Sequence, residues 1–495
     1  MDVSVLAALA VVAYLGVLLW MGNRPAVRGN MADFALGGHR SPWWAVAFGM
    51  IGTSLSGVTF LSVPGWVGDQ QFGYMQMVLG YLVGYGTIIG VLLPLYYRLQ
   101  LTSIYRFLGD RIGPKAHTTG SVFFLISRSI GAAFRLYLVA LVIQETVLPP
   151  TTGGWAWARF ALLIAGILLL IWAYTRKGGI ATVVWTDTLQ TAFMLLAAGT
   201  AFVLIAQKLG LSILEIPSAI AESGHARWWF FEDFGAPNHS VKQLVSGAFI
   251  ALCMTGLDQD MMQKNLSCKN LKDAQLNMGS FSVVLVFVNL LFLGLGALLL
   301  MLSESQGISV ARADLLFATV ALEGNMGWAL PILFLLGLMA AALSSADSAL
   351  TALTTSVCVD FLGMDETASK PKETRQRQRI HLLVSVMVGT LILLFHAVND
   401  NSVIAALFKV ASYTYGPLLG LFAFALFRSK PTPLSLDRWI PWIAVAAPVL
   451  GWLLEQWTTS QGFSFGFALL PVNGFLTWCG ASLMATIKLK EEQQA

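Results

Sequence analysis

LMAAALSSADSALTALTTS, residues 338–356, is a helix-length run of small and apolar residues that also carries several hydroxyls and one carboxyl. Its polar side chains recur at helical spacing and therefore share one stripe of a helix. They are Ser344, Asp347, Ser348, Thr351 and Thr355. An unpaired aspartate facing lipid would cost roughly 3 kcal/mol or more. The stripe must therefore face protein or water, and Asp347 marks a candidate site.

The same stretch places oxygen atoms close together. Helical side chains lean toward the N-terminus, which brings the hydroxyls of Ser344 and Ser345 beside the carbonyl of Ala341, one turn earlier. Neutral oxygens suit a weakly held monovalent cation better than Ca²⁺ or Mg²⁺, which usually take several carboxylates. Small residues with Ser and Thr are also ordinary helix-packing contacts in membranes, and this alternative stays open.

The composition is that of a membrane protein. Of the 495 residues, 56% are hydrophobic and 11% are charged, with a mean hydropathy of +0.71. We predict an all-α polytopic membrane protein with thirteen apolar runs of spanning length, about 20 residues each. The runs are 3–22, 43–66, 73–97, 118–147, 159–175, 180–207, 243–263, 275–302, 328–359, 380–398, 402–427, 438–457 and 466–487. The first run has no basic leader or cleavage site, so we expect it to be structure.

The basic residues predict an orientation, because basic loops stay cytoplasmic. With the N-terminus outside and the C-terminus cytoplasmic, 22 of the 30 Lys and Arg fall on the cytoplasmic side and 5 outside. This fits an inner (plasma) membrane protein of bacterial type. The net charge of +4 is then a topology signal and gives no reason to expect nucleic-acid binding. The 4 cysteines imply no disulfide framework.

A second stretch, GMIGTSLSGVTFLSVPG at 49–65, combines glycines and a proline with hydroxyls. Glycine and proline weaken a helix, and Ser and Thr compete for its backbone, so we expect local unwinding near Gly52 to Gly57. Unwound carbonyls are tolerated in a membrane only where protein, water or an ion satisfies them. This segment is therefore a candidate half of a midplane binding site. A continuous, glycine-packed helix is the alternative.

Span 118–147 carries two arginines seven residues apart, on one helix face. For Arg128, nearer the cytoplasmic side, a structural salt bridge or snorkelling is the plain interpretation. Arg135 lies about 26 Å into the span at 1.5 Å per residue. An arginine at that depth is a candidate partner for an anionic substrate.

Two aspartates reach a similar depth. Asp187 is about 16 Å in from Arg176, and Asp347 is about 20 Å in from Asp360. At the same rise per residue, Gly52 lies about 15 Å into its own span. The two carboxyls, the unwound segment and the hydroxyl stripe are therefore expected to meet in one plane.

Three further polar features are less specific. The DQD at 258–260 resembles a metal-binding DxD, but no second acidic cluster supports a metal, so we favour a polar network at a helix end. The segment 211–241 suggests an external interfacial helix and loop. Lys409, with Tyr413 and Tyr415, is either a structural anchor or a substrate contact.

The spans also suggest an internal repeat. Spans two to six start inside, so spans seven to eleven start outside, and two five-helix units of opposite orientation are what an inverted repeat needs. The expected organisation is a single transporter domain with a leading helix and loop at 1–42, repeats at 43–210 and 242–428, and two trailing helices at 429–495.

Five pieces of the chain together resemble a known family. They are DFALGGHRSPWW, GTSLSGVTF, GGIATVVWTDTLQ, GLDQDMMQ and AAALSSADSALTALTT, in this order. The chain is similar to the sodium/solute symporter family, which includes bacterial sodium/galactose, sodium/proline and sodium/sialic acid transporters. The resemblance implies a LeuT-type five-plus-five fold with one helix before and two after the core, alternating access, and Na⁺ as the coupling ion.

The resemblance also implies site residues. The sodium ligands would be the carbonyls of Gly52, Leu55 and Ala341 with the hydroxyls of Ser344 and Ser345. The substrate contacts would be Ser54, Ser56, Thr59 and Arg135, with Arg135 taking a carboxylate. The chain departs from relatives elsewhere. Gly80 replaces a substrate glutamine of sialic acid transporters, and Ala251 and Met254 replace an asparagine and a gate tyrosine of sugar transporters, which makes galactose-like transport doubtful.

The sialic acid transporters have an additional sodium site, which maps to Asp187, Ser344, Asp347 and Ser348. In this chain Asp347 is a carboxylate where those relatives have a serine. Two nearby carboxylates repel each other, so either a cation lies between them or one of them holds a proton. We therefore expect a possible second sodium site and two sodium ions per solute.

The predicted function is sodium-coupled import of a small organic solute, anionic and sialic-acid-like or another carboxylate. A neutral sugar or amino acid is the alternative substrate. Two alternatives belong to other function classes. One is a passive channel, and the other is an intramembrane enzyme that uses Asp187 and Asp347 as an acid/base pair. The chain has no YD plus GxGD pair and no HExxH, which disfavours the enzyme. The expected partners are the solute and the lipid bilayer, with no obligate protein partner.

Overall fold

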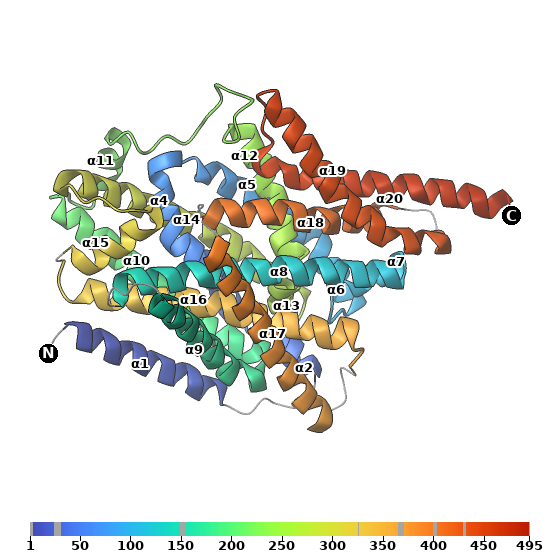
Figure 1. Cartoon of the computed structure of the whole chain (residues 1–495), viewed down its shortest axis with the longest axis horizontal. Coiled ribbons are helices and arrows are strands. Elements are labelled where there is room, and N and C mark those ends of the chain that lie inside the picture. Colours follow the sequence, from blue (N-terminus) through green and yellow to red (C-terminus); the bar gives the residue numbers. More distant parts are fainter. Residues whose placement is uncertain are drawn as a thin grey trace.

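The computed structural model describes residues 3–23, 31–148, 154–324, 326–364, 371–398, 403–428 and 432–494, and within these ranges it is helical without strands (Figure 1). The helices are α1 Val3–Gly22, α2 Met31–Leu36, α3 Trp43–Leu55, α4 Gly57–Gln70, α5 Tyr74–Thr87, α6 Leu93–Leu99, α7 Arg106–Arg111, α8 Pro114–Val142, α9 Gly154–Gly178, α10 Ile180–Lys208, α11 Ile216–Glu222, α12 Ser240–Ala251, α13 Gln259–Leu266, α14 Leu271–Gln306, α15 Leu316–Glu323, α16 Ala329–Ser356, α17 Pro371–Val398, α18 Val403–Phe427, α19 Ile440–Ser460 and α20 Leu469–Gln494. The expected all-α class is confirmed.

Fewer than thirteen of the described helices meet a test of length and hydropathy for membrane spans. Within the described ranges, 9 helices are long and apolar enough to cross a membrane, or up to 11 if each of two bent helix pairs is one span. The prediction of thirteen is not confirmed. The two remaining runs also form helices, α1 and α19. Helix α19 contains two prolines and Glu455, which lower its hydropathy.

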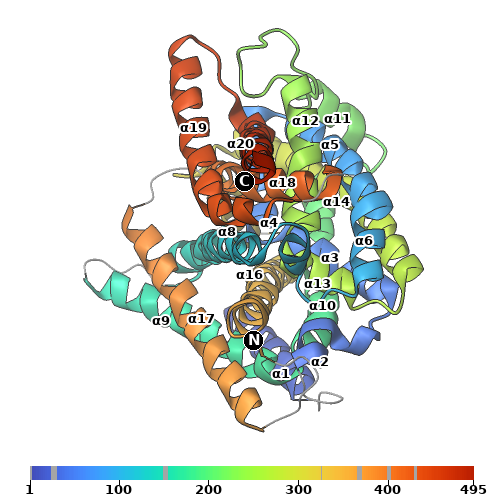
Figure 2. The same cartoon turned by 90° about the vertical axis from the view of Figure 1, so that its right-hand side faces the viewer.

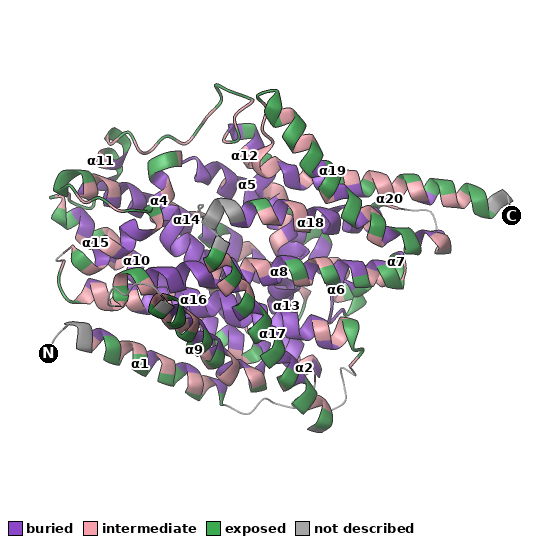
Figure 3. Ribbon diagram, in the orientation of Figure 1, coloured by how far each residue is buried: buried purple, intermediate pink, exposed green. Residues whose placement is uncertain are grey.

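The stretch that carries the hydroxyl stripe lies at the centre of the molecule. Every residue of α16 from Ala340 to Ser356 is buried, so its polar side chains face protein as predicted. Helix α10 packs along α16, and α8, α3 and α1 also contact it. Helices α9 and α17 lie at the edge (Figure 2) and expose much of their surface (Figure 3).

Two helices are interrupted inside the core. Helices α3 and α4 meet at an angle of 55°, and Ser56 between them has a φ of 23°. The expected unwinding near Gly52 to Gly57 is therefore confirmed, and the break falls at Ser56. Helix α12 runs through a π-helical turn, Leu252–Gly256, and meets α13 at 64°. The bent pairs stand first in each of the two expected sets of five spans.

Helices α5 and α12 pack backbone against backbone. A Cβ atom added at Gly80 would lie 2.2 Å from the carbonyl oxygen of Leu244, and one added at Gly247 would lie 2.1 Å from that of Met77. Small residues at such contacts let membrane helices approach closely. Glycine at position 80 is therefore explained by helix packing.

The segment 211–241 matches its prediction of a short helix and a loop. Helix α11 is followed by an irregular chain that ends at α12. The Lys242 ammonium donates hydrogen bonds to the carbonyls of Gly235 at 3.2 Å, Ala236 at 3.2 Å and Ser464 at 2.7 Å. This side chain joins the loop before α12 to the loop between α19 and α20.

Substitution of Gly80 by alanine should destabilise the α5/α12 contact. The added methyl group has no room beside the Leu244 carbonyl, and such overpacking typically costs about 1–3 kcal/mol. Gly80→Ala should therefore lower the thermal unfolding midpoint of the purified protein. Gly86→Ala on the same helix is the matched control, because a Cβ atom added there would point into open space, with no neighbouring atom within 4 Å. It should leave the midpoint unchanged or raised. Equal midpoints for the two variants would contradict the packing argument.

Candidate functional site

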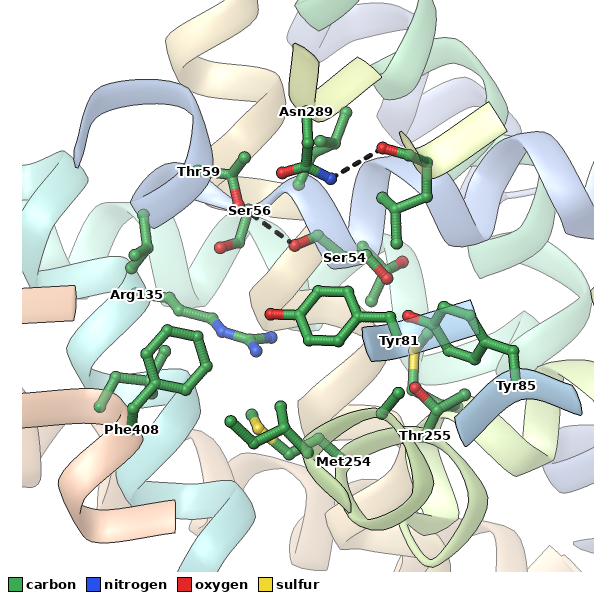
Figure 4. Close-up of a pocket in the computed structure, with 18 of the residues that line it drawn as sticks. Ser54, Ser56, Thr59, Tyr81, Tyr85, Arg135, Met254, Thr255, Asn289 and Phe408 are labelled. Atoms are coloured by element: carbon green, nitrogen blue, oxygen red, sulfur yellow. Dashed lines mark hydrogen bonds between the residues drawn. The ribbon is translucent and has the colours of Figure 1, made fainter. Parts of the chain in front are cut away.

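A cavity lies beside the break between α3 and α4. All four residues predicted to touch substrate line it (Figure 4). Ser54, Ser56 and Thr59 come from the broken helix because the unwound turn aims successive hydroxyls into the space. Arg135 comes from α8. The structure therefore brings the predicted substrate residues together.

The charge of Arg135 is not balanced by a nearby carboxylate. Within the described parts of the chain it forms no salt bridge, and its Nε atom is buried without a hydrogen-bond partner. Figure 4 shows its guanidinium extending toward Tyr81, with Phe408 beside it. A guanidinium in a mostly protein-lined cavity is costly unless an anion accompanies it.

The rest of the wall combines aromatic and aliphatic side chains with a few polar ones, among them Arg128, Thr255 and Asn289. Tyr74, Tyr81 and Tyr85 line it from α5, and the hydroxyls of Tyr74 and Tyr81 lie 3.3 Å apart. The sequence analysis did not select these tyrosines, although their spacings of seven and four residues place them on one helix face. Ala251 and Met254 also line the cavity, so two wall positions offer no hydrogen bond to a solute.

The residues of the expected first sodium site lie where α3 meets α16. Ala341, Ser344 and Ser345 are buried, and the Ser345 hydroxyl has no hydrogen-bond partner. At the break, the Ser56 N–H donates to the Gly52 carbonyl at 3.1 Å, and the Phe60 N–H donates to the Ser56 carbonyl. The Leu55 carbonyl accepts neither of these two hydrogen bonds. A buried hydroxyl and a carbonyl that lack partners are the kind of donors a sodium ion needs, so the residues fit the group that was expected there.

Gly52 itself is fixed by packing. A Cβ atom at this position would lie 2.1 Å from the Thr191 hydroxyl of α10. The close approach keeps α3, α10 and α16 together around the carbonyl end of α3.

The expected second sodium site is only partly assembled. The Ser344 hydroxyl donates to Asp187 Oδ1 at 2.6 Å, so these two members meet. Asp347 instead accepts a hydrogen bond from the Tyr174 hydroxyl at 2.7 Å, and Ser348 donates to Asp260 Oδ1 at 2.7 Å. This ligand set remains a prediction, and its side chains are directed to different partners.

Lys264 is a site residue that the sequence analysis missed. Its ammonium lies 2.6 Å from Asp187 Oδ2 and also contacts the hydroxyl of Thr53. It was counted among the basic residues of a cytoplasmic loop, because the preceding apolar run ends at 263. The bend before α13 turns this short helix into the core, where all eight of its residues are buried.

The remaining buried charges form a network around the start of α13. Arg128 makes salt bridges to Asp260 and, at 4.0 Å, to Asp258. Tyr415 donates a hydrogen bond to Asp258. These contacts agree with the prediction of a polar network at the DQD and with a structural role for Arg128. Tyr415 is an anchor of the same network. Lys409 is exposed. Among the described residues no cluster of three His, Cys, Asp or Glu could hold a metal.

Comparison with known proteins identifies relatives of this chain. A family model described as the sodium:solute symporter family matches residues 34–433. The sodium/sialic acid symporter NanT of Aliivibrio fischeri is 25% identical, over 95% of this chain and 92% of that protein. SiaT of Proteus mirabilis is 24% identical, over 84% of each. The human sodium-coupled monocarboxylate transporter 1 is 26% identical, over 80% of this chain and 64% of that protein.

The fold has solved counterparts as well. A substrate-bound, outward-open Na⁺-coupled sialic acid symporter matches with a TM-score of 0.81 at 18% identity and covers 98% of both chains. A nucleobase-cation-symport-1 family transporter in a closed conformation matches with a TM-score of 0.59 at 14% identity. The first likeness agrees with the expected LeuT-like fold. The family model covers most of the chain, and its members are transporters and not enzymes, with Na⁺ as the coupling ion. The chain therefore belongs to the sodium:solute symporter family.

Proposed function

We propose that this sodium-coupled symporter imports a small organic anion, with Arg135 binding its carboxylate. The observation that carries the proposal is a guanidinium that enters the cavity and forms no salt bridge with any described residue, beside three hydroxyls and three tyrosines. A carboxylate matches the fork of the arginine. The hydroxyls of Ser54, Ser56 and Thr59 supply further hydrogen bonds to the solute.

The relatives favour an anion as well. Two are named for sialic acid and one for monocarboxylates, and both substrate classes carry a carboxylate. A neutral sugar is a weaker candidate, because Ala251 and Met254 give a polyhydroxylated ring nothing to bind. The tyrosines of α5 suit a solute with an apolar or ring-shaped part as well as its charge.

We further propose the first sodium site at the carbonyls of Gly52, Leu55 and Ala341 and the hydroxyls of Ser344 and Ser345. A bound Na⁺ supplies one positive charge at the carbonyl end of α3. The protein residues position the broken helix against α16, and the cavity hydroxyls lie on the same turn as the ligands. Ion and solute are thereby held by neighbouring atoms of one segment.

The architecture we propose is an inverted repeat that works by alternating access. The repeats are 43–210 and 242–428, each opening with a bent helix, with 1–42 before them and 429–495 after them. Counting the apolar part of α1 and α19 as spans gives thirteen, with the N-terminus outside and the C-terminus in the cytoplasm. The excess of Lys and Arg on one side supports this orientation.

Uptake into proteoliposomes tests the function directly. With sodium outside and potassium inside, the purified protein should accumulate a radiolabelled carboxylate, such as sialic acid or a monocarboxylate, above its external concentration. A potassium-only gradient is the control. A passive channel would only equalise the concentrations, and a neutral-solute symporter would accumulate a sugar or amino acid instead.

Removal of a sodium ligand should weaken sodium binding without unfolding the protein. Ser344→Ala and Ser345→Ala should each raise the half-saturating sodium concentration at least several-fold, because a direct oxygen ligand is lost. Ser412→Ala is the matched control, since its hydroxyl is buried but bonds only the Phe408 carbonyl of its own helix at 2.9 Å. Unchanged sodium dependence in both site variants would refute the first sodium site.

Arg135→Lys should impair uptake almost as much as Arg135→Ala. Lysine keeps the charge but loses the planar fork that binds a carboxylate through two hydrogen bonds. Arg98→Lys, on the exposed end of α6, is the control and should transport normally. Normal anion uptake by both Arg135 variants would make this arginine structural and would favour the neutral solute.

A further inference from the structure

The ammonium of Lys264 lies at the position where a second cation was expected. Asp187 and Lys264 form a salt bridge of 2.6 Å, and their side chains are 0% and 1% exposed. The Lys264 ammonium also contacts the Thr53 hydroxyl, and Thr53 donates to the same carboxylate oxygen at 3.1 Å. Asp187 thus has a hydroxyl of α16 on one oxygen and an ammonium on the other.

Lys264 is the basic side chain that contacts Asp187 within this group of buried charges. Four carboxylates are buried in this part of the core, those of Asp187, Asp258, Asp260 and Asp347. Arg128 lies beside the carboxylates of Asp258 and Asp260, and Lys264 neutralises that of Asp187. A further cation at Asp187 would lie close to the ammonium, and two like charges in a buried site repel each other strongly.

The remaining members of the expected ligand set have other partners. Asp347 accepts through Oδ2 from the hydroxyls of Tyr174 at 2.7 Å and Thr186 at 3.4 Å, whereas its buried Oδ1 has no hydrogen-bond partner among the described residues. Ser348 donates to Asp260. The set therefore does not fit a sodium ion beside Asp187. Lys264 neutralises the Asp187 carboxylate, and the Ser348 hydroxyl donates to Asp260 instead.

We propose that Lys264 is a tethered cation that takes the place of a second sodium ion beside Asp187, so that the transporter couples one sodium ion to each solute. This inference rests on the proposed sodium symport and replaces the expectation of two sodium ions. An ammonium has the same charge as Na⁺ and binds the same oxygens, but its covalent stem keeps it on α13.

The proposal has a direct electrical consequence. A tethered charge is not released on the other side of the membrane, so Lys264 adds nothing to the charge that each cycle transports. With one sodium ion and one monovalent anion, transport should be electroneutral. With two sodium ions, each cycle would move one net positive charge.

Counting bound sodium in purified protein tests the proposal without relying on transport. Equilibrium binding of ²²Na⁺ in detergent should give one ion per wild-type chain. Lys264→Met keeps the length of the side chain and removes its charge, so Asp187 becomes free to recruit a second ion and the count should rise toward two. The double variant Asp187→Asn/Lys264→Met removes both charges and should return to one.

Two ions in the wild type, or a single ion in folded Lys264→Met, would overturn the inference. If Lys264→Met does not fold, Lys264→Gln replaces it in the same assay, and the wild-type count by itself still decides against the inference if it is two. A wild-type protein that binds no sodium and shows no sodium-driven uptake would instead overturn the proposed function.

Discussion

Hydrocarbon offers no hydrogen bonds to a helix that stops inside a membrane, and this constraint explains most of the core. Helix α3 ends at Leu55 and the α12 segment ends at Gly256, both in the interior. Many of the groups around these ends are small or carry oxygen. Small residues let α3, α10 and α16 approach closely, and hydroxyls or carboxylates occupy the space that remains. The cavity, the proposed ion ligands and the charge network all border one of the two breaks.

Two features of this core could be predicted from the sequence because each depends on local structure. The polar stripe of α16 follows from helical spacing, and the cost of exposing Asp347 to lipid determines that it faces inward. The unwinding at Ser56 follows from the glycines and hydroxyls around it. The placement of Ser54, Thr59 and Arg135 on one cavity agrees with the family resemblance.

The missed features depend on the direction in which the chain turns. Lys264 follows the end of an apolar run and therefore resembles a loop residue, but a 64° bend carries α13 back into the core. Ser348 shares a stripe with Ser344 but turns to Asp260, a residue 88 positions away in the sequence. The predicted thirteen spans are not confirmed for a different reason, because a count of apolar residues did not weigh the prolines and the glutamate of α19.

The break at Ser56 also places two opposite partial charges next to each other. A helix carries about half a negative charge at its carbonyl end and half a positive charge at its amide end. Helix α3 therefore presents its negative end at Leu55, and α4 presents its positive end at Gly57, two residues later. The first end attracts a cation and the second an anion. The negative end of α3 and the positive end of α4 lie within one turn of backbone. A cation bound at the first end therefore lowers the electrostatic cost of binding an anion at the second, and the reverse also holds. Coupling between ion and solute then does not require a relay through distant residues.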